Sequence, residues 1–228
     1  MATSPFVQHT LLDVDLINNV LTANAMSIVW FPARRCSCWS NLNSNMLATG
    51  SPDSSCATCK GLGRVYPTEY ILTGVVLDDM QDIAIWSEQS GITYGGVIRM
   101  HVPYTIGNLY TQGALNDLIL PQDIVLTTKQ MVIKGVDALD ETPVTPLTLT
   151  SGATTYTQNV DFTIYQRQLT WLTTGPPTNS RYEAVYGFQP WFSIVKGLAI
   201  ANNEAHLNLP RTYVLQLTPS IGELYPYV

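Results

Sequence analysis

All four cysteines of this 228-residue chain lie within one short segment. The second pair belongs to the run Cys56-Ala-Thr-Cys-Lys-Gly-Leu-Gly, and two cysteines separated by two residues can direct both sulfurs at one tetrahedral ion. Gly61 allows the backbone to turn tightly past such an ion. A second pair at this distance predicts a closed site of four thiolates. The predicted metal ligands are Cys36, Cys38, Cys56 and Cys59.

The segment between the two pairs, Trp39–Ser55, is rich in Asn, Ser, Gly and Pro and has little apolar periodicity. Such a segment has no core of its own, so it needs a crosslink to hold one shape. Protein thiolates would fill all four coordination positions, and the predicted site is therefore structural and not catalytic. Zinc is the expected ion, with an iron–sulfur cluster as the less favoured alternative.

Two alternatives to a metal stay open: disulfides between the two pairs, and four unmodified thiols. Cys36 and Cys38 would close a ring too small for easy disulfide geometry, so any bridges would have to join one pair to the other. The first residues, Met-Ala-Thr-Ser-Pro, lack the basic region and apolar core of a secretory signal. We therefore expect synthesis in the cytoplasm, where a reducing environment keeps thiols available for a metal.

The chain is poor in charge: charged residues make up 12% of it, about half the usual share of a soluble protein. A large neutral surface suits a subunit that is buried among neighbours. The net charge of −6 and the scattering of only 11 Lys and Arg argue against a groove that grips nucleic acid. No apolar segment approaches the roughly 20 residues that span a bilayer, so no membrane partner is expected.

Thr, Tyr, Val, Ile and Leu dominate, and alternation between turn signals predicts a mainly β protein with a barrel-like or sandwich-like fold. One short amphipathic helix is expected over Leu11–Ala25. We expect residues 1–140 to form a first β domain that includes this helix and the metal loop 36–63. Residues 141–228 would form a second β unit and a C-terminal tail, unless the two parts make one continuous domain. Tyr104–Leu115 is expected to be a loop, Leu120-Pro121 a turn, and Pro190 an edge or a bend.

Catalytic patterns are not found. The histidines at 9, 101 and 206 are scattered, and His101 is expected to be structural. The acidic residues Asp78, Asp79 and Asp82 lack the spacing of a calcium loop, so a solvated turn is the favoured interpretation. Aromatic residues between Tyr156 and Phe192 are expected to fill a β core or a subunit interface, since few Arg and Lys are interleaved with them. No catalytic residue is predicted, and we expect that the protein is not an enzyme.

The order of motifs resembles the neck, or head–tail connector, proteins of tailed bacteriophages. Those proteins place a cysteine-rich metal loop, ending Cys-x-x-Cys-x-Gly-x-Gly before an aromatic strand, in the first third of the chain; here it is Cys56–Tyr66. A β unit with spaced aromatic residues and a Pro/Gly turn follows. Its matching positions are Tyr156, Asp161, Phe162, Leu169, Trp171, Gly175-Pro176-Pro177, Tyr182, Ala184-Val185-Tyr186, Pro190-Trp191, Val195 and Leu209-Pro210-Arg211. Three features depart from the family pattern: Asn159 where Gly is common, a Cys-x-Cys first pair, and the tail after Arg211.

This resemblance implies a structural virion protein that is assembled in the bacterial cytoplasm. It would form a ring of six or twelve identical subunits in the neck and join the portal or adaptor to the tail terminator or tail tube. Genomic DNA would pass through the ring without specific binding. A head-closing ring is favoured, because the helical bundle of an adaptor is not expected here. The alternatives are a zinc-ribbon nucleic-acid-binding protein and another phage tail or baseplate protein.

Overall fold

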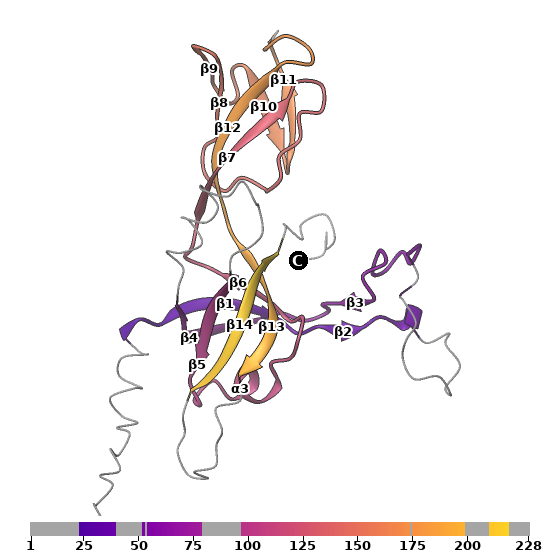
Figure 1. Cartoon of the computed structure of the whole chain (residues 1–228), viewed down its shortest axis with the longest axis vertical. Coiled ribbons are helices and arrows are strands. Elements are labelled where there is room, and N and C mark those ends of the chain that lie inside the picture. The colour runs from indigo at the N-terminus through magenta and orange to yellow at the C-terminus, as the bar shows by residue number, and fades with distance from the viewer. Residues whose placement is uncertain are drawn as a thin grey trace, which may run out of the picture.

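The computed structural model describes residues 23–39, 52, 54–78, 97–173, 175–198 and 210–218. Within them the protein is mainly β, as the sequence predicted, and it combines a closed barrel, a second β unit and a projecting arm (Figure 1). Apart from its last three residues, the predicted helix over Leu11–Ala25 lies outside the described residues. So do His9, His206, Asp79 and Asp82.

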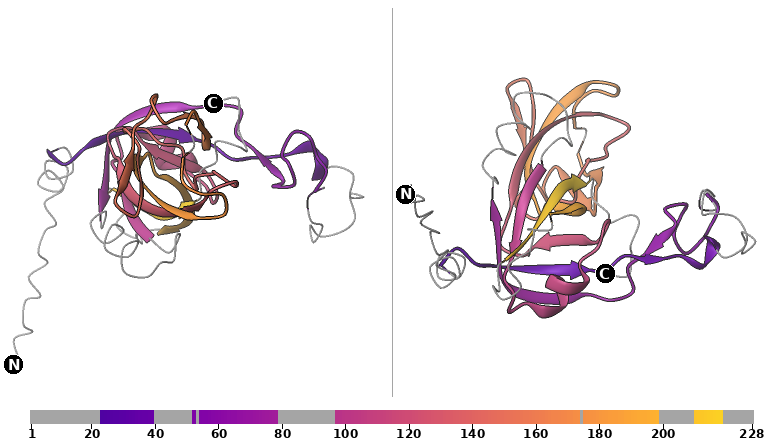
Figure 2. Two further views of the ribbon diagram at one scale, coloured as in Figure 1. Left: turned by 90° about the horizontal axis from the view of Figure 1, so that it is seen from above. Right: turned by 60° about the horizontal axis from the view of Figure 1, so that its bottom comes forward.

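Six antiparallel strands close into the barrel (Figures 1 and 2). In order around it they are β1 (Met26–Phe31), β4 (Tyr70–Asp78), β5 (Val97–Val102), β14 (Arg211–Thr218), β13 (Trp191–Leu198) and β6 (Leu118–Pro121), which pairs with β1. Side chains alternate between the core and the surface: in β5, Ile98 and Met100 are buried, whereas Val97 and Arg99 are exposed. Closure pairs every barrel strand on both sides, so the barrel has no open edge.

A second β unit, residues 126–188, is inserted between β6 and β13, and we call it the distal unit (Figure 1). It consists of a four-stranded sheet and a hairpin with their own core. The sheet has the order β7 (Leu126–Ile133), β12 (Arg181–Phe188), β8 (Thr148–Ser151) and β9 (Thr154–Tyr156), and the hairpin is β10 (Phe162–Tyr165) with β11 (Gln168–Trp171). Their apolar side chains form a cluster separate from the barrel core.

The strands are not divided between these two units at a single point near residue 140. Strand β7 precedes that residue and lies in the distal sheet, while β13 and β14 follow it and lie in the barrel. The chain passes from the distal sheet to the barrel between β12 and β13, where Pro190 stands. Pro190 therefore marks a bend, one of the two roles predicted for it.

Two local predictions were wrong. Gly107–Gln112, expected to lie in a loop, form the short helix α3, because Leu109 is fully buried in the barrel core and the Tyr213 hydroxyl donates to its carbonyl oxygen at 2.9 Å. Leu120-Pro121 is the end of β6 and not a turn, since Pro121 pairs with Ile28. The tail after Arg211, which matched no pattern, supplies strand β14. None of the helices described is long and apolar enough to cross a bilayer.

The cysteine-containing segment is inserted between the barrel neighbours β1 and β4, and we call residues 34–65 the arm. It begins with β2 (Arg34–Arg35) and a 3₁₀ turn, η1 (Ser37–Trp39), and it ends with β3 (Arg64–Val65). β2 and β3 pair with each other, so they extend the β1–β4 hairpin beyond the barrel. This metal loop projects away from the barrel (Figures 1 and 2).

Candidate metal centre

The arm brings the four cysteine sulfurs together, although the two pairs are separated by seventeen residues. All four Sγ atoms lie within 4.8 Å of one another. The Cys36 and Cys56 sulfurs are 3.8 Å apart, and those of Cys38 and Cys59 are 3.4 Å apart. An ion with metal–sulfur bonds of about 2.3 Å in a tetrahedron separates its sulfurs by about 3.8 Å. The spacing therefore fits four thiolates around one ion.

The turn that carries the second pair is shaped by left-handed backbone positions. Lys60 and Gly61 have φ angles of 47° and 85°. A Cβ atom on Gly61 would lie only 3.1 Å from the Ser54 Cα, so glycine is favoured there for space as well as for conformation. The turn directs the Gly63 N–H to the Cys59 sulfur at 3.2 Å.

The two halves of the cluster are joined through the backbone. The Cys36 N–H donates to the Gly63 carbonyl oxygen at 2.9 Å, next to the β2–β3 ladder. Cys36 and Cys59 are buried, whereas Cys38 and Cys56 are half-buried. In this arrangement one thiol of each pair lies inside the arm and the other lies near its surface.

The thiolate is the form of cysteine that binds metals. The backbone N–H groups of Cys59 and Thr58 hydrogen-bond to the Cys56 sulfur and lower the pKa of its thiol to about 6. All four residues are thiols in this structure, and their closest sulfurs are well beyond the roughly 2.05 Å of a disulfide bond.

The root of the arm is attached to the barrel by a buried carboxylate, Asp117, which the sequence analysis did not identify. Its oxygens accept hydrogen bonds from the Trp30 indole N–H at 2.8 Å, the Ala33 N–H at 2.8 Å and the Ala114 N–H at 2.9 Å. Asp117 is 1% exposed, and this burial raises the pKa of its carboxyl above the ordinary value even though the three hydrogen bonds lower it.

The other strand of the arm is attached to the same loop. The Tyr66 hydroxyl, one residue beyond β3, donates to the Asn116 carbonyl oxygen at 3.0 Å. Ala33, one residue before β2, is held by Asp117. Both ends of the arm are therefore fixed to residues 116–117 of the barrel, and the arm leaves the barrel in a defined direction.

The remaining sequence candidates take structural positions. The His101 ring hydrogen-bonds to the Thr212 hydroxyl across the β5–β14 pair at 3.0 Å. Trp171 packs edge-on against Tyr156 and Tyr182 inside the distal unit. The indole N–H of Trp171 and the Tyr182 hydroxyl both donate to Asp137, at 2.9 and 2.8 Å. These aromatic residues build the distal core.

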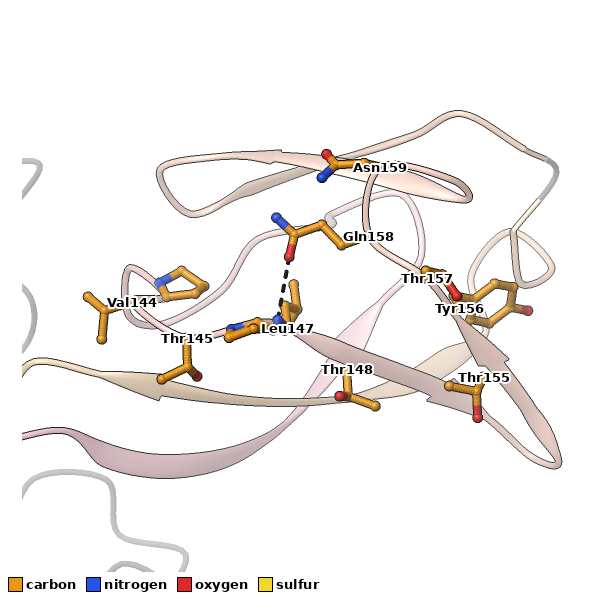
Figure 3. A pocket seen from close by; sticks show the side chains of 11 residues that line it. Val144, Thr145, Leu147, Thr148, Thr155, Tyr156, Thr157, Gln158 and Asn159 are labelled. Atoms are coloured by element: carbon orange, nitrogen blue, oxygen red, sulfur yellow. Dashed lines mark hydrogen bonds between the residues drawn. The ribbon is translucent and has the colours of Figure 1, made fainter.

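A hollow of about 700 Å³ in the distal unit is a second candidate site, which the sequence did not indicate (Figure 3). It lies where the segment 143–148 and the segment 155–159 separate beyond the β8–β9 pair, and the Gln158 side chain accepts a hydrogen bond from the Leu147 N–H at 3.5 Å. Hydroxyl, amide and apolar groups line the hollow, and Asp, Glu, His, Lys and Arg are absent from its described lining. It offers no carboxylate, imidazole or amine for acid–base chemistry.

No protein-family model matches the chain, and no curated protein sequence is significantly similar to it.

Proposed function

We propose that the four cysteines bind a structural zinc ion. The observation that supports this is the convergence of four sulfurs within 4.8 Å, with two of them buried. Four sulfur ligands in a tetrahedral arrangement suit zinc or an iron–sulfur centre, and zinc is the ion of closed structural sites built from spaced cysteine pairs. With four protein ligands the ion has no open position for a substrate, so its role is to hold the arm.

The protein itself we assign to the neck of a tailed bacteriophage, as a ring subunit between portal and tail. The support is the motif order of the sequence, together with a closed barrel from which the arm with its four clustered cysteines projects (Figure 2). Because the arm lies outside the barrel core, we assign it the role of contacting other molecules. Heterologous contacts of this kind between identical subunits must close into a ring or continue indefinitely.

The partners in this assignment are other copies of the chain, the portal or adaptor on one side, and the tail terminator or tail tube on the other. DNA passes through the ring, and a net charge of −6 suits a channel that does not grip phosphate. The role is structural and not catalytic. Among the described residues, the carboxylates with shifted pKa values are Asp117 and Asp137, and both are engaged in hydrogen bonds that hold the fold.

Electron microscopy of the purified chain mixed with portal protein, and of phage particles carrying a labelled copy, tests this function. Rings of six or twelve subunits at the head–tail junction are the expected result. A label at the baseplate would support a different tail protein. A monomer that never joins a particle would contradict the assignment.

A zinc-ribbon nucleic-acid-binding role is the second candidate. One observation favours it: four of the eleven Lys and Arg lie in the arm, and all four are exposed. Such a protein would bind duplex DNA with a steep salt dependence, because its affinity comes from released counterions. A titration of DNA at low and high salt separates this role from that of a ring subunit.

A further inference from the structure

The arm and the rest of the chain carry opposite formal charges. Residues 34–65 contain four Lys and Arg and one acidic residue, Asp53, which gives +3; the seven Lys and Arg and sixteen acidic residues elsewhere leave −9. A divalent ion on four thiolates contributes −2, so the occupied arm is still at +1. The arm is therefore positive and the rest of the chain negative, whether or not the metal is bound.

The pairing of β2 with β3 places two of these cations on one face. Arg35 is directly opposite Arg64 in the antiparallel ladder, and Arg34 is opposite Val65. Directly opposite residues of such a ladder project from the same face, and like charges in that position are destabilising. All three arginines are exposed. Two guanidinium groups on one exposed face can contact the same anionic group.

The same arginines line a hollow of about 260 Å³ at the root of the arm. Arg34, Arg35 and Arg64 share its lining with Ala33, Gly63 and Leu115. The guanidinium group offers a planar pair of donors that matches a carboxylate, and such charge-assisted pairs are shorter and stronger than neutral hydrogen bonds. Leu115 is 57% exposed and adds an apolar contact beside the charges.

The position of this hollow is fixed from two directions. The backbone bond from Cys36 to Gly63 holds the strands in register on the side of the cysteine cluster. The contacts of Ala33 with Asp117 and of Tyr66 with Asn116 hold them on the side of the barrel. The three arginines thus lie on a short ribbon between two anchors, which limits the conformational entropy lost when a ligand binds.

We propose that this arginine-lined hollow is the docking site for an acidic surface of a second copy of the chain. The inference rests on the proposed ring. Each copy carries a basic arm and an acidic remainder, so arm-to-body contacts repeat from one subunit to the next in the heterologous manner that closes rings. Charge complementarity favours this occupant over nucleic acid, because the chain as a whole is acidic and repels phosphate.

The test compares the zinc-loaded chain with the double variant Arg35→Gln/Arg64→Gln. Arg181→Gln is the matched control, since Arg181 is an exposed arginine on β12 of the distal unit. Self-association is measured by sedimentation velocity across a range of salt concentrations, with zinc content and circular dichroism as checks of folding. We expect association of the wild-type chain to weaken as salt rises, and the double variant to associate at least about tenfold more weakly at low salt. The Arg181 variant should behave as wild type.

Each other outcome has a distinct meaning. A double variant that keeps its zinc and associates as well as wild type overturns this inference and leaves the proposed ring intact. A wild-type chain that stays monomeric at every salt concentration, alone and with portal, contradicts the ring itself. A duplex DNA probe that binds wild type and is released by the double substitution assigns the hollow to nucleic acid and overturns the second copy as its occupant.

Discussion

The arm is inserted between two strands of the barrel, but the two regions are stabilised by different means. The barrel buries a cluster of apolar side chains from six strands, and its ladder closes on itself. Among the described residues of the arm, the buried ones are two of the clustered cysteines, Cys36 and Cys59, and Gly63, whose N–H contacts the Cys59 sulfur. The barrel therefore depends on the burial of apolar surface, whereas the arm depends on whatever joins its sulfurs.

The largest expected effect comes from removing one sulfur. Cys59→Ser should abolish tight metal binding, because structural zinc sites contribute roughly 10–16 kcal/mol and a buried hydroxyl is a poor substitute for a thiolate. Hydrogen exchange should then be fast throughout the described part of the arm and unchanged in β5, β13 and β14. Ala57→Ser, at an exposed position between Cys56 and Cys59, is the control and should keep its metal. If the barrel amides lost protection together with the arm, the two regions would not be independent.

The converse substitution weakens the barrel and spares the arm. Phe192 is fully buried in the barrel core, so Phe192→Ala should lower the free energy of unfolding by about 3–5 kcal/mol. Denaturant titration measures that loss, and the zinc content of the folded variant should equal that of wild type. Val195→Ala, at an exposed position of the same strand, should change stability by no more than about 0.5 kcal/mol. A loss of zinc from folded Phe192→Ala protein would contradict the separation.

Asp117 connects the two regions, and its removal should affect both. Asp117→Ala leaves the buried indole N–H of Trp30 and the backbone N–H groups of Ala33 and Ala114 without their acceptor, at a cost of about 2–3 kcal/mol. Thermal unfolding should report this cost, and hydrogen exchange at Ala33 should rise while the metal stays bound. Asp117→Asn keeps one side-chain oxygen as an acceptor, so it should lose less stability than Asp117→Ala. Equal losses in the two variants would show that the carboxylate is not the link.

The smallest effect concerns pH. Burial raises the pKa of Asp117 in the folded state, so the folded chain binds a proton at this carboxyl at a higher pH than the unfolded chain does. As pH falls through the folded pKa, protonation of Asp117 therefore increases the free energy of unfolding. Asp137 in the distal unit has the opposite sign. Burial raises its pKa, but hydrogen bonds from Trp171 and Tyr182 outweigh this and lower it, so its contribution is present above the ordinary pKa and is lost as pH falls through the folded value.

Urea titrations of wild type, Asp117→Asn and Asp137→Asn between neutral and acidic pH measure these two contributions as differences. Relative to Asp117→Asn, the free energy of unfolding of the wild type should rise as the pH is lowered. Relative to Asp137→Asn, the free energy of unfolding of the wild type should fall as the pH is lowered. Slopes of the same sign would contradict the environments assigned to the two carboxylates.

Local patterns predicted much of this molecule, and long-range contacts account for what they missed. Alternation located most strands, and cysteine spacing located the cluster, because both signals lie within a few neighbouring residues. Strand β6 was missed because its residues Leu118, Ile119 and Pro121 are all buried and do not alternate. Asp117 follows Asn116 in a segment with no motif, and its partners Trp30 and Ala33 lie 87 and 84 residues away. A buried carboxylate of this kind becomes visible only when the fold brings its donors together.

The claim that a metal ion holds the arm is tested most directly by measuring zinc and hydrogen exchange on the same sample. The chain should be purified under reducing conditions, and its metal content should be determined by elemental analysis. About one zinc per chain is expected, and a chelator should remove the amide protection of the arm while the barrel keeps its own. Intact disulfides without metal, or an arm that stays protected after the zinc has been removed, would contradict the account.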